Sequence, residues 1–140
     1  MKPKKLPDQF HRANLLLDKI DLKAESTWAI FYIVENTTDS ELIEKEALQR
    51  VLPVNEKSHE FHFYGKQVQR WENAFDLADI TAHPNASDEE IALTMVYHDL
   101  DEFINTLQEE ISSRRFSPHD TYLLYDDETL YKYVLSKLKY

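Results

Sequence analysis

The stretch TWAIFYIV, residues 27–34, contains the longest apolar run in the chain and is rich in aromatic and β-branched side chains. A run of this length and composition is typical of a buried strand. Two shorter segments, HEFHFY (59–64) and TYLLY (121–125), are bounded by polar residues and also favour strands. Together the three segments predict a small sheet of about three strands.

Helices are predicted around these strands from capping residues, apolar spacing and charge. Asp8 and Ser87 can each cap a helix, and the acids after Ser87 suit the positive end of the helix dipole. The lysines near the C-terminus suit the negative end of a last helix. The expected helices cover residues 8–20, 37–53, 87–113 and about 126–140. The prediction is therefore a helix-rich α+β domain that spans residues 1–140.

An all-α helical bundle is the alternative fold. Apolar side chains between residues 61 and 78 follow spacings of 3, 4, 3, 4 and 3, which would align them along one helix from about 58 to 80. The chain has a single glycine, Gly65, whereas sheet proteins usually need glycine at turns. Both observations favour helices over strands in this region.

Composition excludes several kinds of site. The chain has no cysteine, so disulfides, thiolate catalysis and cysteine-based zinc sites are excluded. One glycine cannot make a glycine-rich phosphate loop. No apolar run approaches the roughly 20 residues that span a bilayer, so we expect a cytoplasmic protein without membrane contact. Residues 1–6 should form a basic, mobile tail.

Acidic residues are concentrated in one part of the chain. The formal net charge is −10, and residues 71–113 contain eleven acids and no lysine or arginine. Such a segment repels phosphate backbones and attracts basic partners. This pattern therefore disfavours direct binding of nucleic acid and favours a basic protein partner.

The motif YHDLDEF, residues 97–103, lies within this acidic segment. On a helix, Leu100 joins an apolar stripe, whereas His98 and Glu102 project from the opposite, solvated side. Asp99 and Asp101 fall on the two flanks and cannot chelate one ion together, so no metal site or cofactor is predicted. The residues expected to bind a partner are Asp99, Asp101, Glu102 and Glu109, with Ile91 and Met95 as apolar contacts.

A second motif, RRFSPHDTY, contains Arg114 and His119 separated by four residues. This spacing resembles the R-x4–6-H motif of HEPN-type ribonucleases. The resemblance implies an all-helical domain that cleaves RNA without a metal. Arg114 would position the phosphate and His119 would move protons, usually across a dimer.

Taken together, these patterns favour a small, non-enzymatic protein-binding module of the immunity-protein, antitoxin, inhibitor or regulatory-adaptor type. Its acidic helix face would bind a basic protein partner. One alternative is an enzyme, either the Arg114/His119 ribonuclease or a hydrolase with a histidine–carboxylate metal site at His98 or His59. Another alternative is a structural subunit that forms a homodimer.

Overall fold

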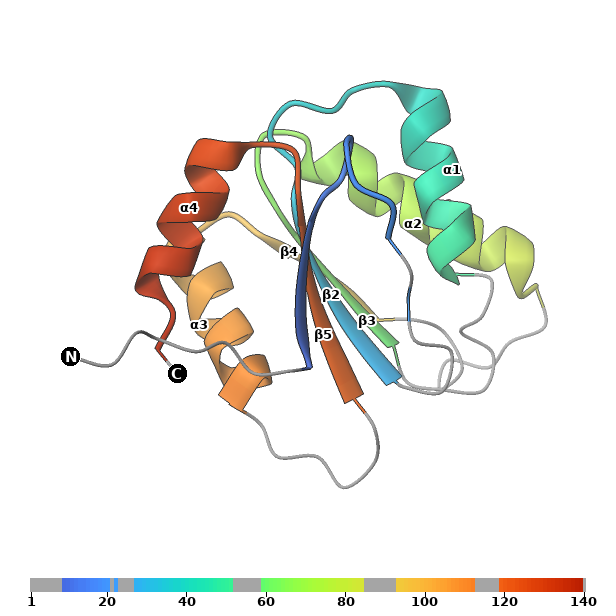
Figure 1. Cartoon of the computed structure of the whole chain (residues 1–140). Coiled ribbons are helices and arrows are strands. Elements are labelled where there is room, and N and C mark those ends of the chain that lie inside the picture. Colours follow the sequence, from blue (N-terminus) through green and yellow to red (C-terminus); the bar gives the residue numbers. More distant parts are fainter. Residues whose placement is uncertain are drawn as a thin grey trace.

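The computed structural model describes residues 9–20, 22, 27–51, 59–84, 93–112 and 119–139. Five parallel strands form one sheet in the order β1-β5-β2-β3-β4, and four helices pack against it (Figure 1). The strands are β1 (Phe10–Asn14), β2 (Thr27–Ile33), β3 (His59–Tyr64), β4 (Leu93–Tyr97) and β5 (His119–Tyr125). The helices are α1 (Ser40–Val51), α2 (Val68–Ala82), α3 (Leu100–Ser112) and α4 (Glu128–Lys137).

The protein is thus an α/β protein with a Rossmann-like arrangement, and both predicted folds are wrong. A parallel sheet needs a crossover between consecutive strands, and α1, α2 and α3 supply the three crossovers from β2 to β5. The predicted sheet was too small because only the three central strands, β5, β2 and β3, have a strong apolar signal. The two edge strands, β1 and β4, are short and half-exposed.

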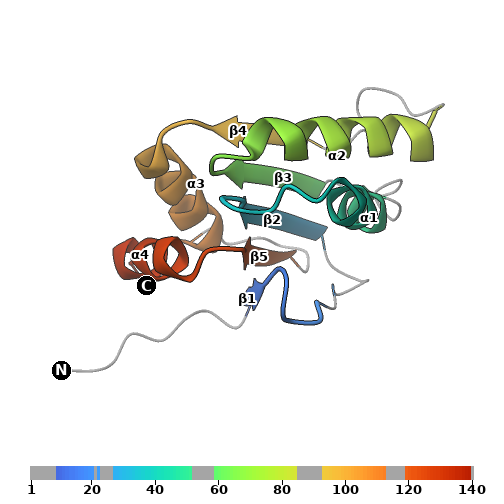
Figure 2. The ribbon, with the colours of Figure 1, turned by 90° about the horizontal axis from the view of Figure 1, so that it is seen from above.

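Helices cover both faces of the sheet, with α1 and α2 on one side and α3 and α4 on the other (Figures 1 and 2). Strand β2 lies at the centre and alternates between the two cores. Ile30 and Tyr32 pack under α1 and α2, whereas Phe31 and Ile33 pack on the α3 and α4 side. Burial on both faces explains why residues 28–34 are apolar throughout, without alternating polar positions.

The helix predicted over residues 8–20 is wrong. Strand β1 pairs with β5 instead, so Phe10 enters one core and Ala13 the other. A turn follows the strand, in which the Asn14 side chain accepts hydrogen bonds from the backbone N–H groups of Leu16 and Leu17. An apolar spacing that suited a helix therefore belongs to a strand and a turn.

The helix predicted over residues 87–113 is wrong in its first half. Residues 93–97 form β4, and α3 begins only at Leu100. The long helix from 58 to 80 is also wrong, because Gly65 separates β3 from α2. The three predicted strands and the helices that became α1 and α4 are confirmed.

Some predicted features lie outside the described residues, namely the basic tail over residues 1–6, Ile91 and Arg114. Within the described part of the chain, no helix is both long and apolar enough to cross a membrane.

Strand order places a topological switch point beside β2. The chain passes from β2 to β3 and β4 on one side, then returns through α3 to β5 on the other. The segments that follow β2 and β5 therefore leave the sheet in different directions, and in open α/β sheets ligands bind in the crevice at that point. The carboxyl edge between β2 and β5 is the first place to look for a site.

Candidate functional site

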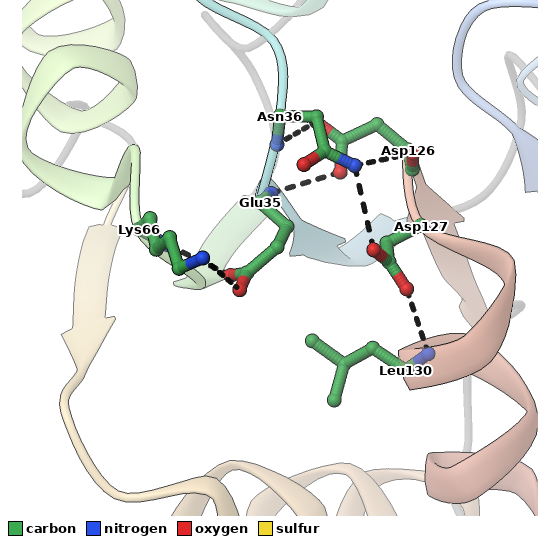
Figure 3. A network of polar contacts seen from close by, with 6 residues as sticks. All are labelled: Glu35, Asn36, Lys66, Asp126, Asp127 and Leu130. Carbon is green, nitrogen blue, oxygen red and sulfur yellow. Dashed lines mark hydrogen bonds and ion pairs between the residues drawn. The ribbon is translucent and has the colours of Figure 1, made fainter.

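The carboxylate of Asp126 occupies the switch point. It follows β5 and accepts four hydrogen bonds from the segment after β2, of which Figure 3 draws those from Glu35 and Asn36. The donors are the backbone N–H groups of Glu35 (2.8 Å), Asn36 (3.0 Å) and Thr37 (2.8 Å), and the Thr37 hydroxyl (2.7 Å). Three successive N–H groups thus converge on one anion.

Converging backbone N–H groups form an anion-binding concavity. In proteins with this fold, the turn after the first strand of the switch point and the helix that follows it commonly hold a ligand phosphate. Here the chain's own carboxylate satisfies those donors, so an anionic ligand would have to displace Asp126. Glu35 and Asp127 beside it would repel such a ligand further.

Other contacts tie three loops of this edge together (Figure 3). Glu35 accepts a hydrogen bond from the backbone N–H of Lys66 (2.9 Å), which follows β3, and its second oxygen lies 3.7 Å from Lys66 Nζ. The Asn36 amide donates to the Asp126 carbonyl (3.3 Å) and to Asp127 (3.4 Å). Asp127 in turn caps α4 by accepting from Leu130 N (2.9 Å). The edge is consequently a closed polar network.

A different surface is formed where the edge strand β4 meets α3. Within β4, Thr94 bonds to Asp76 of α2 and Val96 packs in the core under α1 and α2, so the alternate residues face α3. Leu93 is 52% exposed, and Met95 and Tyr97 are half-buried. We call this the β4–α3 surface; it comprises Glu60, Leu93, Met95, Tyr97, Glu102 and Glu109.

Negative charges on this surface act on the Tyr97 hydroxyl. Burial raises the pKa of Tyr97, and the negative charges of Glu60, Glu102 and Glu109 raise it further, against a hydrogen bond with Thr106 that lowers it. Two of these acids come from α3 and one from β3. The β4–α3 surface therefore combines apolar and aromatic side chains with a concentration of negative charge.

Beneath this surface lies a buried histidine. His62 Nδ1 and the Tyr97 hydroxyl are hydrogen-bonded at 2.8 Å, and the imidazole stacks on Phe31 at a centroid distance of 4.1 Å. His62 Nε2 lies 3.6 Å from a carboxylate oxygen of Glu60. Since His62 is only 1% exposed, it fixes the orientation of Tyr97 from below.

The predicted partner-binding residues divide between the two regions. Glu102 and Glu109 are exposed on α3 and belong to the β4–α3 surface, which also includes Met95 from the neighbouring strand rather than from the same helix. Asp99 follows β4 and accepts a hydrogen bond from Asp101 N (2.8 Å) at the start of α3. Burial, and then the charges of Glu35 and Asp99, raise the pKa of Tyr64 at the end of β3. Asp99 therefore belongs to the carboxyl edge.

The ribonuclease alternative loses the all-helical setting that it requires. His119 begins strand β5, so the all-helical setting that the ribonuclease resemblance requires is absent. His98 is exposed in the β4–α3 loop, whereas His59 begins β3. Among the described residues, no group of three or more histidine, aspartate or glutamate side chains is arranged to hold a metal ion.

Sequence reasoning missed Asp126, Glu35, Glu60 and the His62–Tyr97 pair. Asp126 appeared only as the start of a helix, and its partners lie about 90 positions away in the chain. His62 and Tyr97 come together because β3 pairs with β4. The aspartate after an apolar strand was the one available signal, because such a residue lies at the carboxyl edge of a parallel sheet.

The geometry thus offers a polar network closed by Asp126 and an exposed acidic surface beside an edge strand. Of the two, the β4–α3 surface is the one that combines exposed apolar and acidic side chains, with Leu93 52% exposed. Comparison of the chain with protein-family models, with curated proteins and with solved structures found no match.

Proposed function

We propose that this protein is a non-enzymatic binding module whose β4–α3 surface binds a basic protein partner, as an immunity protein, antitoxin, inhibitor or regulatory adaptor would. The observation that carries the proposal is the placement of the exposed acids Glu102 and Glu109 on α3, which packs against the half-buried Tyr97 of β4 through Phe103. Apolar side chains flanked by charges are the usual composition of a protein interface.

Charge makes a basic partner the favoured one. No lysine or arginine occurs between residues 71 and 113, so the chain supplies no cation from this segment to neutralise the acids of α3. Exposed carboxylates steer a cationic partner toward the surface and discriminate against anionic ones. The carboxylate at the switch point also supports binding over nucleotide chemistry, because it occupies the position where this fold commonly holds phosphate.

Partner capture with a charge-reversed bait tests the proposal. The purified protein would be used to capture partners from lysate of its source, at low and at high salt. The test bait is Glu102→Lys with Glu109→Lys; Asp99 and Asp101 stay unchanged because Asp99 caps α3. The control bait is Glu41→Lys with Glu44→Lys, which makes the same charge change on α1, on the other face of the sheet (Figure 1).

We expect a basic protein to bind the wild-type and control baits. It should be lost with the test bait and at high salt. Equal capture by test and control baits would contradict the proposal, and so would binding that is indifferent to salt.

A further inference from the structure

We infer that the partner contributes an extended basic segment, which pairs with the outer edge of β4 as a sixth strand of the sheet. Strand β4 pairs with β3 on one side, and within the described residues no strand pairs with its other side. This inference rests on the proposed function, because it specifies how the β4–α3 surface holds its partner.

The β4 edge has the composition of a strand that accepts another. Its sequence, LTMVY, has high β-propensity and contains no charge, proline or glycine. Natural edge strands are usually protected from further pairing by charged side chains, proline or bulges. The opposite edge, β1, carries Arg12 and His11 and is followed directly by the turn at Asn14. Of the two edges, β4 is therefore the one suited to strand addition.

The charges beside β4 determine which kind of segment can pair with its edge. Glu102 and Glu109 belong to α3, and Glu60 pairs with Leu93 and so shares the α3 side of the sheet, whereas Asp76 of α2 accepts a hydrogen bond from Thr94 (2.9 Å) on the other side. A second copy of this chain would bring the same acids to the same edge, and like charges brought together oppose association. A basic segment would meet carboxylates on both faces of the sheet.

The pleat of a strand defines the pattern of that segment. Successive side chains of an added strand point to opposite faces, so alternate residues lie beside Met95 and Tyr97 and the others beside Thr94. Lysine or arginine at alternate positions would place cationic groups near Glu102 and Glu109. The backbone N–H groups of the segment would donate to the carbonyl groups of β4, and its carbonyl groups would accept from the N–H groups of β4, which supplies affinity without dependence on side chains.

A titration monitored by nuclear magnetic resonance tests this arrangement. The ¹⁵N-labelled protein would be titrated at low salt with a capped heptapeptide, KTKTKTK. A matched peptide carries an N-methyl group at every residue, so it keeps the charge but cannot donate backbone hydrogen bonds. The expected result is a change in the amide signals of residues 93–97, with binding at least about tenfold weaker for the N-methylated peptide.

The outcomes separate this inference from the proposed function. Equal binding of both peptides, with changes confined to α3, would overturn strand addition and leave the acidic surface as the binding site. Full binding by the Glu102→Lys, Glu109→Lys variant would overturn the role of charge at this edge. A dimer of the protein alone, with its signal changes in β4, would assign the edge to a second copy and overturn the inference. The partner-capture experiment tests the proposed function independently of all three results.

Discussion

Asp126 joins the two strands on either side of the switch point, so the carboxyl edge depends on its charge and on both of its oxygens. We expect Asp126→Asn to lower the free energy of unfolding by about 2 kcal/mol. The amide keeps one carbonyl acceptor, but it places an NH₂ group against the N–H donors of residues 35–37. Urea unfolding, followed by circular dichroism, measures the change.

The neighbouring Asp127 provides the control. It caps α4 through Leu130 N, and asparagine caps helices about as well as aspartate does. Asp127→Asn should therefore change the unfolding free energy by less than about 0.5 kcal/mol. Equal losses in the two variants would contradict a special role for the Asp126 carboxylate.

Gly65 allows the ends of β2 and β3 to approach each other. Its φ angle is +135°, and a Cβ atom added there would lie 2.5 Å from the carbonyl oxygen of Val34. Because both the backbone conformation and the contact oppose a side chain, Gly65→Ala should destabilise the protein by about 3 kcal/mol. The measurement is again a urea unfolding curve.

Lys66→Ala is the matched change at the next position. The Lys66 side chain is 77% exposed, and its ion pair with Glu35 spans 3.7 Å, so its removal should cost less than about 1 kcal/mol. A Gly65→Ala variant as stable as Lys66→Ala would show that the two loops can separate without loss.

At the scale of elements, each helix is held by the side chains that it buries. On α3, Leu107 is fully buried with Phe103 in the core shared with α4. On α2, Leu77 is 65% exposed and lines a groove between α1 and α2. Leu107→Ala should cost about 3 kcal/mol, whereas Leu77→Ala should cost less than about 0.5 kcal/mol. Thermal or urea unfolding of both variants checks the difference.

The same comparison tests the placement of α3. If α3 were not docked on the sheet through Leu107, the two substitutions would have similar effects. The acidic face of α3 would then have no defined position relative to β4, and the β4–α3 surface would lose its basis.

At the scale of the whole molecule, tyrosines buried in both cores make the protein sensitive to alkaline pH. Burial raises the pKa of Tyr32 in one core, with Glu46 as a further cause, and burial and Glu128 raise the pKa of Tyr125 in the other to about 12. A tyrosine in the unfolded chain loses its proton near pH 10. Between about pH 10 and 12 the unfolded state therefore binds fewer protons than the folded state, and stability falls as pH rises.

The contribution of these tyrosines to the free energy of unfolding should be constant up to about pH 10 and should decline above that pH. Replacing one buried hydroxyl, with Tyr125→Phe, should reduce the decline between about pH 10 and 12. Urea unfolding at a series of pH values measures both profiles. An identical decline in the two proteins would show that the Tyr125 hydroxyl does not contribute.

The sequence by itself determined the elements whose burial pattern is local and unambiguous. Residues 28–34 are apolar throughout, and residues 59–64 and 121–125 are rich in aromatic or aliphatic side chains; the three segments form the central strands. Capping residues and charges correctly located α1 and α4. The acidic character of residues 71–113 also follows from sequence alone, although its role in binding stays a prediction.

Only the tertiary structure decided the edges of the sheet and the site. The apolar spacing through β1 and β4 fits a helix as well as a strand, and pairing with β5 and β3 determines which one forms. Likewise, Asp126 meets donors that are 89 to 91 positions away, and Tyr97 meets His62 across 35 positions. The physical reason is that the periodicity of apolar residues indicates which side of a segment is buried, whereas the element that packs against this side is defined only by the tertiary fold.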